Sequence, residues 1–297
     1  MRWHLAQINV GTLRAPIDDP LIADFAAGLD PMNAAGEAAP GFVWRLEDDS
    51  GNATSIQAFD DPLTILNLTV WESIESLRDF AYRGVHRDFL RRRAEWFEPE
   101  RSATALWWIT AGSLPTVGEA VRRLAFVDRY GSTPYAFRMG QQHPRLGMAR
   151  TTLSDPAAIG LIERLDAELS ALYPEPGANH FTLTPAQVAD GAGGFVVAHL
   201  DDTPVGCGAY RMIEPGVAEI KRMFVDPAVR GIKLGAAILD TLEGAAIGDG
   251  ATRLVLETGT RQLAALGLYE RFGFTPTPAW GEYLDSADTS VCLAKPC

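Results

Sequence analysis

A short stretch of small and apolar residues joins a predicted strand to a predicted helix and has the composition of an anion-binding turn. The run 220–225 is rich in β-branched and aromatic residues, as a buried strand is, and Asp226-Pro227 ends it because proline cannot donate to a sheet. From 231 to 248 the apolar residues recur at helical spacing. The first amides of such a helix lack intrahelical partners and carry partial positive charge, which suits a pyrophosphate. Gly231 and Gly235 have no Cβ to hold phosphate oxygens away from those amides.

Two motifs in this half of the chain resemble hallmarks of one enzyme family. The segment 230–235, RGIKLG, resembles the acyl-CoA-binding motif of the GNAT acetyltransferase superfamily, and 269–274, YERFGF, resembles the end of its last helix. The resemblance covers roughly residues 147–297 and implies a GNAT fold with a mixed, mostly antiparallel sheet whose closing strands lie near 279–283 and 290–294. It implies that acetyl-CoA contacts Met223, Phe224, Val225, Arg230, Gly231, Ile232, Lys233, Leu234, Gly235, Ala236 and Gln262.

Two of these residues depart from the family pattern. Lys233 stands where the family has its central glycine, and Gln262 stands where members often carry an asparagine. Because a helical φ is negative, we expect lysine to adopt the backbone conformation at 233. Its side chain would either crowd the pyrophosphate or bind it through the ammonium group, and the sequence leaves both interpretations open.

The resemblance also implies two catalytic side chains. An alkylammonium has a pKa of about 10.4, so it must lose a proton before it can attack a thioester. Glu219 is interpreted as that base, acting through water, and an ion pair with Lys221 is the alternative. Tyr269 matches the tyrosine that protonates the departing thiolate, and packing against pantetheine is its alternative role. Strand alternation predicts Glu219, Lys221, Met223 and Val225 on one face, and a backbone N–H of 223–225 is expected to hold the oxyanion.

The acceptor is not identified beyond the class of small-molecule primary amines. The residues expected to border the acceptor side of the GNAT fold are Tyr173, His180, Arg211, Glu257, Trp280 and Tyr283. Cys207 lies in the middle of a predicted strand between two glycines, so we expect the amine to attack directly in a ternary complex, without a covalent acyl-enzyme. No metal ion is expected.

Length and charge restrict the class of protein. A chain of 297 residues predicts two domains. The net charge of −12 argues against nucleic acid and anionic membranes as partners, because both select a cationic surface. The 3 cysteines indicate no disulfide framework. With no signal-peptide pattern and no run long enough to span a bilayer, the sequence predicts a cytoplasmic protein.

The first half of the chain has a different pattern. The polar segment 140–147 predicts a boundary that gives domains of residues 1–145 and 146–297. Strand-like runs at 4–10, 42–46, 65–71 and 106–110 interleave with helical patterns at 20–29, 73–80, 86–96 and 117–130, which indicates a ferredoxin-like α+β sheet. Motifs such as 93–97, RAEWF, and 106–108, LWW, resemble an uncharacterised bacterial family similar in build to antibiotic-biosynthesis monooxygenase domains.

That second resemblance implies a dimeric α/β barrel and therefore a homodimer formed through the N-terminal domain. Within such a barrel we expect Trp44, Asn67, Tyr82 and His86 to line a cavity. The alternative is that the aromatic residues fill the core and the dimer interface.

Three hypotheses about function follow. The leading one is an acetyl-CoA-dependent N-acetyltransferase acting on a small amine. A second is a sensor whose C-terminal half binds acyl-CoA without turnover, because Lys233 distorts the turn. A third is a bifunctional protein with a monooxygenase-like N-terminal half.

Overall fold

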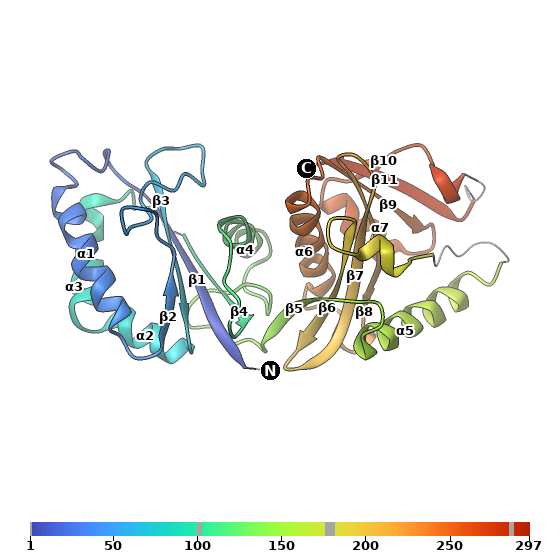
Figure 1. Cartoon of the computed structure of the whole chain (residues 1–297), viewed down its shortest axis with the longest axis horizontal. Coiled ribbons are helices and arrows are strands. Elements are labelled where there is room, and N and C mark those ends of the chain that lie inside the picture. Colours follow the sequence, from blue (N-terminus) through green and yellow to red (C-terminus); the bar gives the residue numbers. More distant parts are fainter. Residues whose placement is uncertain (1, 100–102, 176–181, 285–287) are drawn as a thin grey trace. The chain divides into compact units, whose positions relative to one another are not determined.

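The computed structural model describes residues 2–99, 103–175, 182–284 and 288–297, and the chain divides into two compact units (Figure 1). The first unit is Met1–Leu146 and the second is Gly147–Cys297. The boundary predicted from the sequence lies between residues 145 and 146.

The first unit is a four-stranded antiparallel sheet with four helices. Its elements are β1 (Trp3–Thr12), α1 (Ala23–Glu37), β2 (Phe42–Arg45), β3 (Thr64–Trp71), α2 (Ile74–Tyr82), α3 (Gly84–Trp96), β4 (Ala103–Thr110) and α4 (Val117–Tyr130). The strands lie in the order β2-β3-β1-β4, and every adjacent pair is antiparallel. Through β4 this is the succession of a split βαβ unit, with two helices, α2 and α3, in its second helical position.

Both faces of this sheet are covered by elements of the same chain. Helices α1, α2 and α3 lie on one face and α4 lies on the other (Figure 1). Ile8 and Trp107 pack with Leu124 of α4, while Leu13 packs with Phe25 and Trp96 on the opposite face. A dimeric barrel would need one open sheet face for its partner. The sheet therefore completes its own core, and the predicted homodimer stays a prediction.

Helix α1 differs from its predicted bounds of 20–29. Asp19 forms a turn in which its carboxylate accepts the Leu21 amide and its carbonyl accepts the Ile22 amide, so the helix begins at Ala23. The helix then continues through Pro31 to Glu37. The prediction ended too early because the apolar pattern weakens before the proline. At the start of α2, Ser73 is the N-cap, and its side chain accepts the Ser76 amide.

The second unit is built on a seven-stranded sheet. Its elements are β5 (Leu146–Thr151), α5 (Pro156–Leu172), β6 (Gly193–Leu200), β7 (Thr203–Glu214), β8 (Val217–Val225), α6 (Leu234–Gly248), β9 (Arg253–Gly259), α7 (Leu263–Arg271), β10 (Thr275–Pro276) and β11 (Ser290–Pro296), with short 3₁₀ helices at Pro185–Val188, Pro227–Val229 and Gly281–Tyr283. The order is β10-β11-β9-β8-β7-β6-β5. The pair β8–β9 is parallel, joined through α6, while β6–β7, β7–β8, β9–β11 and β10–β11 are antiparallel.

Two local predictions in this unit are wrong. The expected strand near 279–283 is a 3₁₀ helix, Gly281–Tyr283, and the strand that pairs with β11 is β10, Thr275–Pro276. The expected alternation along β8 is interrupted by a bulge, because Arg222 and Met223 both lie opposite the single residue Gly208. Arg222 has a φ of 57°. Beyond this bulge Phe224, not Met223, follows Glu219 and Lys221 on one face.

Candidate active site

Strands β8 and β9 separate in the middle of the second unit. Their parallel pairing runs from Val217–Arg253 to Ile220–Leu256 and then stops, although β8 continues to Val225 and β9 to Gly259. The bulge at Arg222 begins two residues after the last pair. Backbone groups on the facing edges of both strands are thus left without a ladder partner from each other, and an extended ligand can lie between them.

A cavity of about 90 Å³ lies at this separation. The residues that line it come from α5, β8, β9, the turn after β9, α7 and the last 3₁₀ helix. They are Leu165, Leu169, Ile220, Lys221, Arg222, Met223, Glu257, Thr258, Gln262, Ala265, Tyr269 and Tyr283. We call this cavity the cleft. Four of its lining side chains, those of Lys221, Glu257, Tyr269 and Tyr283, can exchange a proton, and Arg222 adds a fixed positive charge.

The turn that leads into α6 has the geometry of an anion-binding loop. Gly231 has a φ of 98° and Lys233 a φ of 66°, directly before the first residue of the helix, Leu234. A Cβ at Gly231 would meet nothing within 4 Å, so the backbone angle, not crowding, favours glycine there. Successive amides in such a loop and in the first helical turn converge on one point, which suits a phosphate.

The structure corrects the prediction for Lys233. The helix begins at Leu234, not Gly231, and Lys233 is its N-cap in the left-handed conformation. A negative, helical φ was expected for this residue. Because left-handed backbone favours glycine, the conformation gives a physical reason for the glycine of the family pattern and a cost for lysine.

Some of the other residues predicted to bind acetyl-CoA are buried. Leu234 and Ala236 are buried at the start of α6, and Phe224 is buried against α5 in the core. Arg230 forms an ion pair with Glu168 and donates its Nε to the Val225 carbonyl, which fixes the turn.

Gln262 has a local role. Its side-chain oxygen accepts the Gly259 amide and the Thr258 hydroxyl, both at 2.9 Å. It thereby holds the turn between β9 and α7 beside the cleft.

Tyr269 reaches the cleft from α7. Its hydroxyl donates to the Met223 sulfur at 3.7 Å, and the residue is only 6% exposed. Burial, with a smaller contribution from the nearby Glu257 charge, raises the pKa of Tyr269 well above its ordinary value. The phenol is therefore protonated across the physiological range and has a proton to donate there.

Among the described residues of the unit, Glu219 is the most deeply buried charge, with 0% exposure. Its Oε2 accepts the Arg211 Nε at 2.6 Å, and its Oε1 accepts the Tyr283 hydroxyl at 2.6 Å. Lys221 lies 3.9 Å from the carboxylate but donates at 2.7 Å to both the Tyr283 hydroxyl and Glu282. Burial, then the Glu219 charge and hydrogen bond, raise the pKa of Tyr283. Tyr283 therefore connects the cleft to the buried Glu219 carboxylate through its hydroxyl group.

Comparison with known proteins was made for both units. Residues 158–274 match the family model described as "Acetyltransferase (GNAT) family". An IAA acetyltransferase of Azospirillum brasilense is 38% identical over 145 residues, which cover 47% of this chain and 91% of that protein. The chain belongs to the GNAT acetyltransferase family. Residues 4–152 match a second model, described as a domain of unknown function, DUF3291, which also covers half of the chain.

Further relatives share the acetyltransferase half. An uncharacterized N-acetyltransferase of Schizosaccharomyces pombe is 37% identical over 76 residues, covering 25% of this chain and 47% of that protein. A solved acetyltransferase structure from Streptococcus agalactiae is 18% identical, with a TM-score of 0.42, and covers 51% of this chain and 98% of that one. As a GNAT family member, the protein is an acyltransferase. The predicted likeness to monooxygenase domains has no counterpart among these findings.

Only some of the residues predicted to border the acceptor side line the cleft. Glu257 and Tyr283 line the cleft. Tyr173 is buried and its hydroxyl accepts the Arg261 amide at 2.5 Å, which ties α5 to the turn after β9. Trp280 packs edge-on against Tyr283, and Arg211 lies behind Glu219. His180 lies outside the described residues.

Three charged residues at the site, Lys221, Arg222 and Glu282, were not predicted from the sequence or were given another role. Lys221 lines the cleft, although it was considered only as the partner of Glu219. Glu282 binds both Arg211 and Lys221. The charges on the neighbouring strands were the available signal. Arg211 and Lys221 are two cations beside the single carboxylate of Glu219, so a second carboxylate is expected nearby. Glu282, which directly precedes Tyr283, supplies it.

Cys207 is buried in the sheet, and desolvation raises the pKa of its thiol to about 12. It is therefore no nucleophile at neutral pH.

Among the residues placed by the structure, none of the helices is both long and apolar enough to span a bilayer. The same part of the chain holds no group of three or more histidine, cysteine, aspartate or glutamate side chains that could bind a metal ion.

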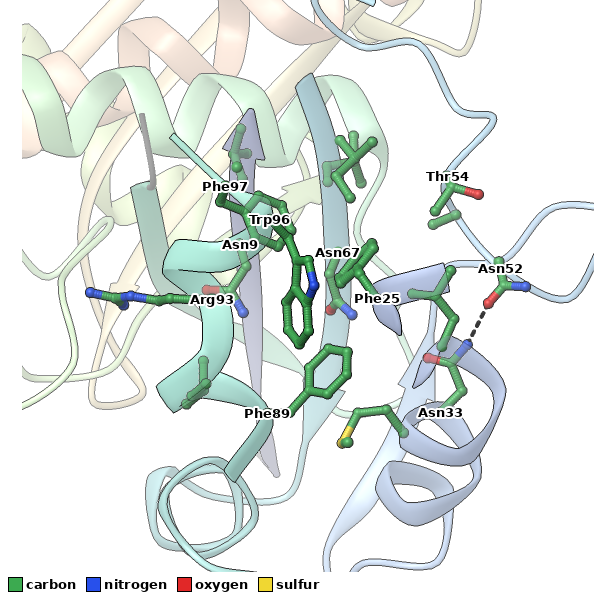
Figure 2. Close-up of a pocket in the computed structure, with 18 of the residues that line it drawn as sticks. Asn9, Phe25, Asn33, Asn52, Thr54, Asn67, Phe89, Arg93, Trp96 and Phe97 are labelled. Carbon is green, nitrogen blue, oxygen red and sulfur yellow. Dashed lines mark hydrogen bonds between the residues drawn. The ribbon is translucent and has the colours of Figure 1, made fainter. Parts of the chain in front are cut away.

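The first unit has a larger cavity, of about 260 Å³, between its sheet and helices α1 and α3 (Figure 2). Asn67 and His86 line it, as predicted. Trp44 packs against the core on the other face of the sheet, and Tyr82 is 54% exposed at the end of α2. The cavity prediction is therefore confirmed for two of its four residues and wrong for the other two.

Proposed function

We propose that the second unit transfers the acetyl group of acetyl-CoA to a small-molecule primary amine by direct attack in a ternary complex. The observation that carries this proposal is the separation of β8 from β9 beyond the pair Ile220–Leu256, with the cleft at that point. The left-handed turn before α6 follows β8 after one short 3₁₀ helix, Pro227–Val229. A phosphate-binding turn and a slot between strands, on one continuous segment, suit a long ligand with a phosphate at one end.

The residues present fit acetyl-CoA. The amides from Gly231 to Ala236 would hold the pyrophosphate, and the open edges of β8 and β9 would accept hydrogen bonds from, and donate them to, the pantetheine arm. When bound, the co-substrate supplies an activated acetyl thioester. The ladder between β8 and β9 ends before the bulge of β8, and a backbone N–H of 223–225 would hold the oxyanion that forms at the thioester carbonyl.

Proton removal from the amine is assigned to Glu219 through Tyr283. Glu219 itself is fully buried, whereas Tyr283 lines the cleft and donates its hydroxyl proton to the carboxylate. The hydroxyl can take a proton from the ammonium group, directly or through one water, while it gives its own proton to Glu219. This relay needs no phenolate, which agrees with the raised pKa of Tyr283. It also modifies the interpretation of Glu219 as a base in contact with the amine.

The leaving thiolate is assigned to Tyr269. The nitrogen attacks the carbonyl carbon, the C–S bond breaks, and the Tyr269 hydroxyl gives a proton to the sulfur. A thiol is a good leaving group even without this proton, since its pKa is near 8.5. The contribution of Tyr269 is therefore expected to be modest.

The test is acetyl-CoA turnover, followed as thiol release, with a panel of primary amines and the variants Glu219→Gln and Tyr283→Phe. Both variants should lower kcat/KM by about 10²-fold near neutral pH, as expected for loss of general base catalysis. The deficit should shrink as the pH approaches the pKa of the amine, because the free base then needs no help. Rates equal to wild type at every pH would remove Glu219 and Tyr283 from the mechanism.

The sensor alternative has its own outcome in this experiment. Binding of acetyl-CoA without thiol release for any amine would favour a non-catalytic role and overturn the proposed acceptor class.

For the first unit, the predicted homodimer is tested by the mass of the full chain in solution, and a monomeric mass would contradict it. Oxygen uptake with aromatic substrates tests the predicted monooxygenase-like activity, for which nothing in the structure supplies support.

A further inference from the structure

The cavity of the first unit collects an unusual set of side chains. The chain contains five asparagines, and four of them, Asn9, Asn33, Asn52 and Asn67, line this one cavity. The fifth lies outside the described residues. These four come from β1, α1, the segment between β2 and β3, and β3, so their meeting is a product of the fold and not of a local motif.

The floor of the cavity is a row of polar residues across three strands. Asn67 on β3, Asn9 on β1 and Thr104 on β4 are direct cross-strand partners. The Thr104 hydroxyl donates to the Asn9 carbonyl oxygen at 2.7 Å, which leaves the Asn9 NH₂ group for another partner. Both asparagines are exposed to the cavity. Within the described part of the chain the structure records no hydrogen bond to the Asn67 side chain.

The neighbouring row of the same sheet face shows what a purely structural polar row looks like. There the Thr69 hydroxyl donates to the Gln7 carbonyl oxygen, and the Trp71 indole donates to Thr69. All three residues are buried and satisfy one another. The row of Asn67 and Asn9, by contrast, presents amide donors and acceptors to an open space.

The walls of the cavity are aromatic. Phe25 packs edge-on against Phe97 at 5.1 Å, and Phe89 lies 4.7 Å from Trp96. Two glycines make room for these rings: a Cβ at Gly28 would lie 2.4 Å from the Phe89 ring, and one at Gly11 would lie 2.7 Å from the Phe97 ring. Figure 2 shows Phe25, Phe89 and Trp96 gathered beside Asn67.

The ion-forming side chains among the described residues that line the cavity are Arg45, Arg93 and His86. Among the described residues that line it there is no aspartate or glutamate, although the chain carries a net charge of −12. Arg45 is already bound to Glu37, Glu47 and the Gly51 carbonyl. The Arg93 guanidinium points away from Phe89 and Asn33 (Figure 2). Desolvation lowers the pKa of His86, which favours its neutral form.

We propose that this cavity is a binding site for a small, neutral, flat heteroaromatic molecule whose hydrogen-bonding edge pairs with the side-chain amides of Asn67 and Asn9. Aromatic rings select a flat ligand, and an amide selects a partner that offers a donor and an acceptor side by side. An apolar cavity of about 150 Å³ holds benzene, so the 260 Å³ found here suits a molecule of two fused rings. Binding here is independent of the acetyltransferase reaction of the second unit.

The experiment uses calorimetric titration of the full chain with 2-quinolone, a neutral bicyclic lactam with adjacent N–H and C=O groups. The expected result is saturable binding with a Kd below about 1 mM. N-methyl-2-quinolone has the same rings but no N–H donor, and should bind at least about tenfold more weakly, because the Asn67 amide oxygen loses its partner. Equal affinity for the two compounds would overturn the amide-pairing part of the proposal.

Three variants locate the site. Asn67→Leu should weaken 2-quinolone binding by at least about tenfold and reduce the preference over the N-methyl compound. Gly28→Ala should push the Phe89 ring toward the cavity and weaken both compounds. Thr110→Val, on the same strand as Thr104 but outside the cavity lining, is the matched control and should bind as wild type does. The absence of saturable binding by the wild-type chain, or unchanged binding by Asn67→Leu with its melting temperature retained, would overturn the proposal.

Discussion

The two cavities of this protein are built from opposite kinds of polar group. The cleft of the second unit places Lys221, Glu257, Tyr269 and Tyr283 at a break between two strands, with Glu219 behind them. The cavity of the first unit lies on an unbroken sheet and presents amides and rings. Groups that exchange protons suit chemistry, whereas amides, which do not titrate, suit recognition. The difference assigns catalysis to one unit and ligand binding to the other.

The polar groups of the two units are also held in different ways. Arg211 and Glu219 form a pair with side-chain exposures of 14% and 0%, in which removal of either partner leaves a buried charge. The amides of the first cavity are uncharged and face open space, so replacing one leaves no uncompensated charge.

Arg211→Met should have the largest effect, a loss of about 3–5 kcal/mol in the stability of the second unit, because it leaves the Glu219 carboxylate buried without its cation. Hydrogen exchange of the β7 and β8 amides would measure it unit by unit. Arg138→Met removes an ion pair whose side chains are 48% and 53% exposed, and should change stability by less than about 1 kcal/mol. Similar losses of stability in the two variants would show that the buried ion pair of Arg211 matters no more than the exposed pair of Arg138.

Gly231→Val should weaken acetyl-CoA binding by about 10²-fold. A β-branched residue at a φ of 98° costs roughly 1–3 kcal/mol and displaces the amides that hold the pyrophosphate. Gly250 offers a matched control at the other end of α6, with a φ of 92° and equally open surroundings. Gly250→Val should cost stability but leave the affinity unchanged in calorimetric titration. Equal affinities for the two variants would show that the turn does not bind the co-substrate.

Tyr269→Phe should lower kcat by about 3–10-fold and leave KM for acetyl-CoA nearly unchanged. The variant keeps the packing of the ring but loses the proton donor beside the cleft. Steady-state kinetics with one good acceptor amine would measure both constants. A fall of more than about 10³-fold would mean that protonation of the thiolate limits the reaction, contrary to the modest role assigned here.

Lys233→Gly should have the smallest effect. It relieves a left-handed non-glycine residue but adds flexibility to the unfolded chain, so the net gain in stability should lie between 0 and about 1 kcal/mol. Affinity for acetyl-CoA should stay within about threefold of wild type, because the backbone already has the conformation that glycine would take. Binding by the glycine variant alone would mean that the lysine side chain closes the site.

Much of the second unit could be predicted because its signals are local. A strand, a proline break and a glycine turn before an apolar helix lie within one continuous segment, and β8 ends at Val225, where the predicted strand run ends. The left-handed Lys233 could not be predicted from its own type, since lysine rarely adopts that conformation. The bulge at Arg222 was missed because a bulge depends on pairing with β7, which alternation along β8 does not reveal.

Contacts between residues far apart in the sequence were the least predictable feature. Asn9, Asn33, Asn52 and Asn67 are spread over nearly sixty positions, and only the register of β1 against β3 brings Asn9 opposite Asn67. The hydrogen bond of Tyr283 to Glu219 joins residues 64 positions apart. Sequence spacing carries no signal for such contacts, whereas burial of a charge does indicate that partners must exist.

The most direct test of the division between the two units is hydrogen–deuterium exchange of the full chain with and without acetyl-CoA. We expect slower exchange of the amides at 230–236 and along the separated ends of β8 and β9, with the amides around Asn67, Phe89 and Trp96 unchanged. Protection confined to the first unit, or no protection at 230–236 at a saturating concentration, would contradict the assignment of the acetyl-CoA site to the second unit.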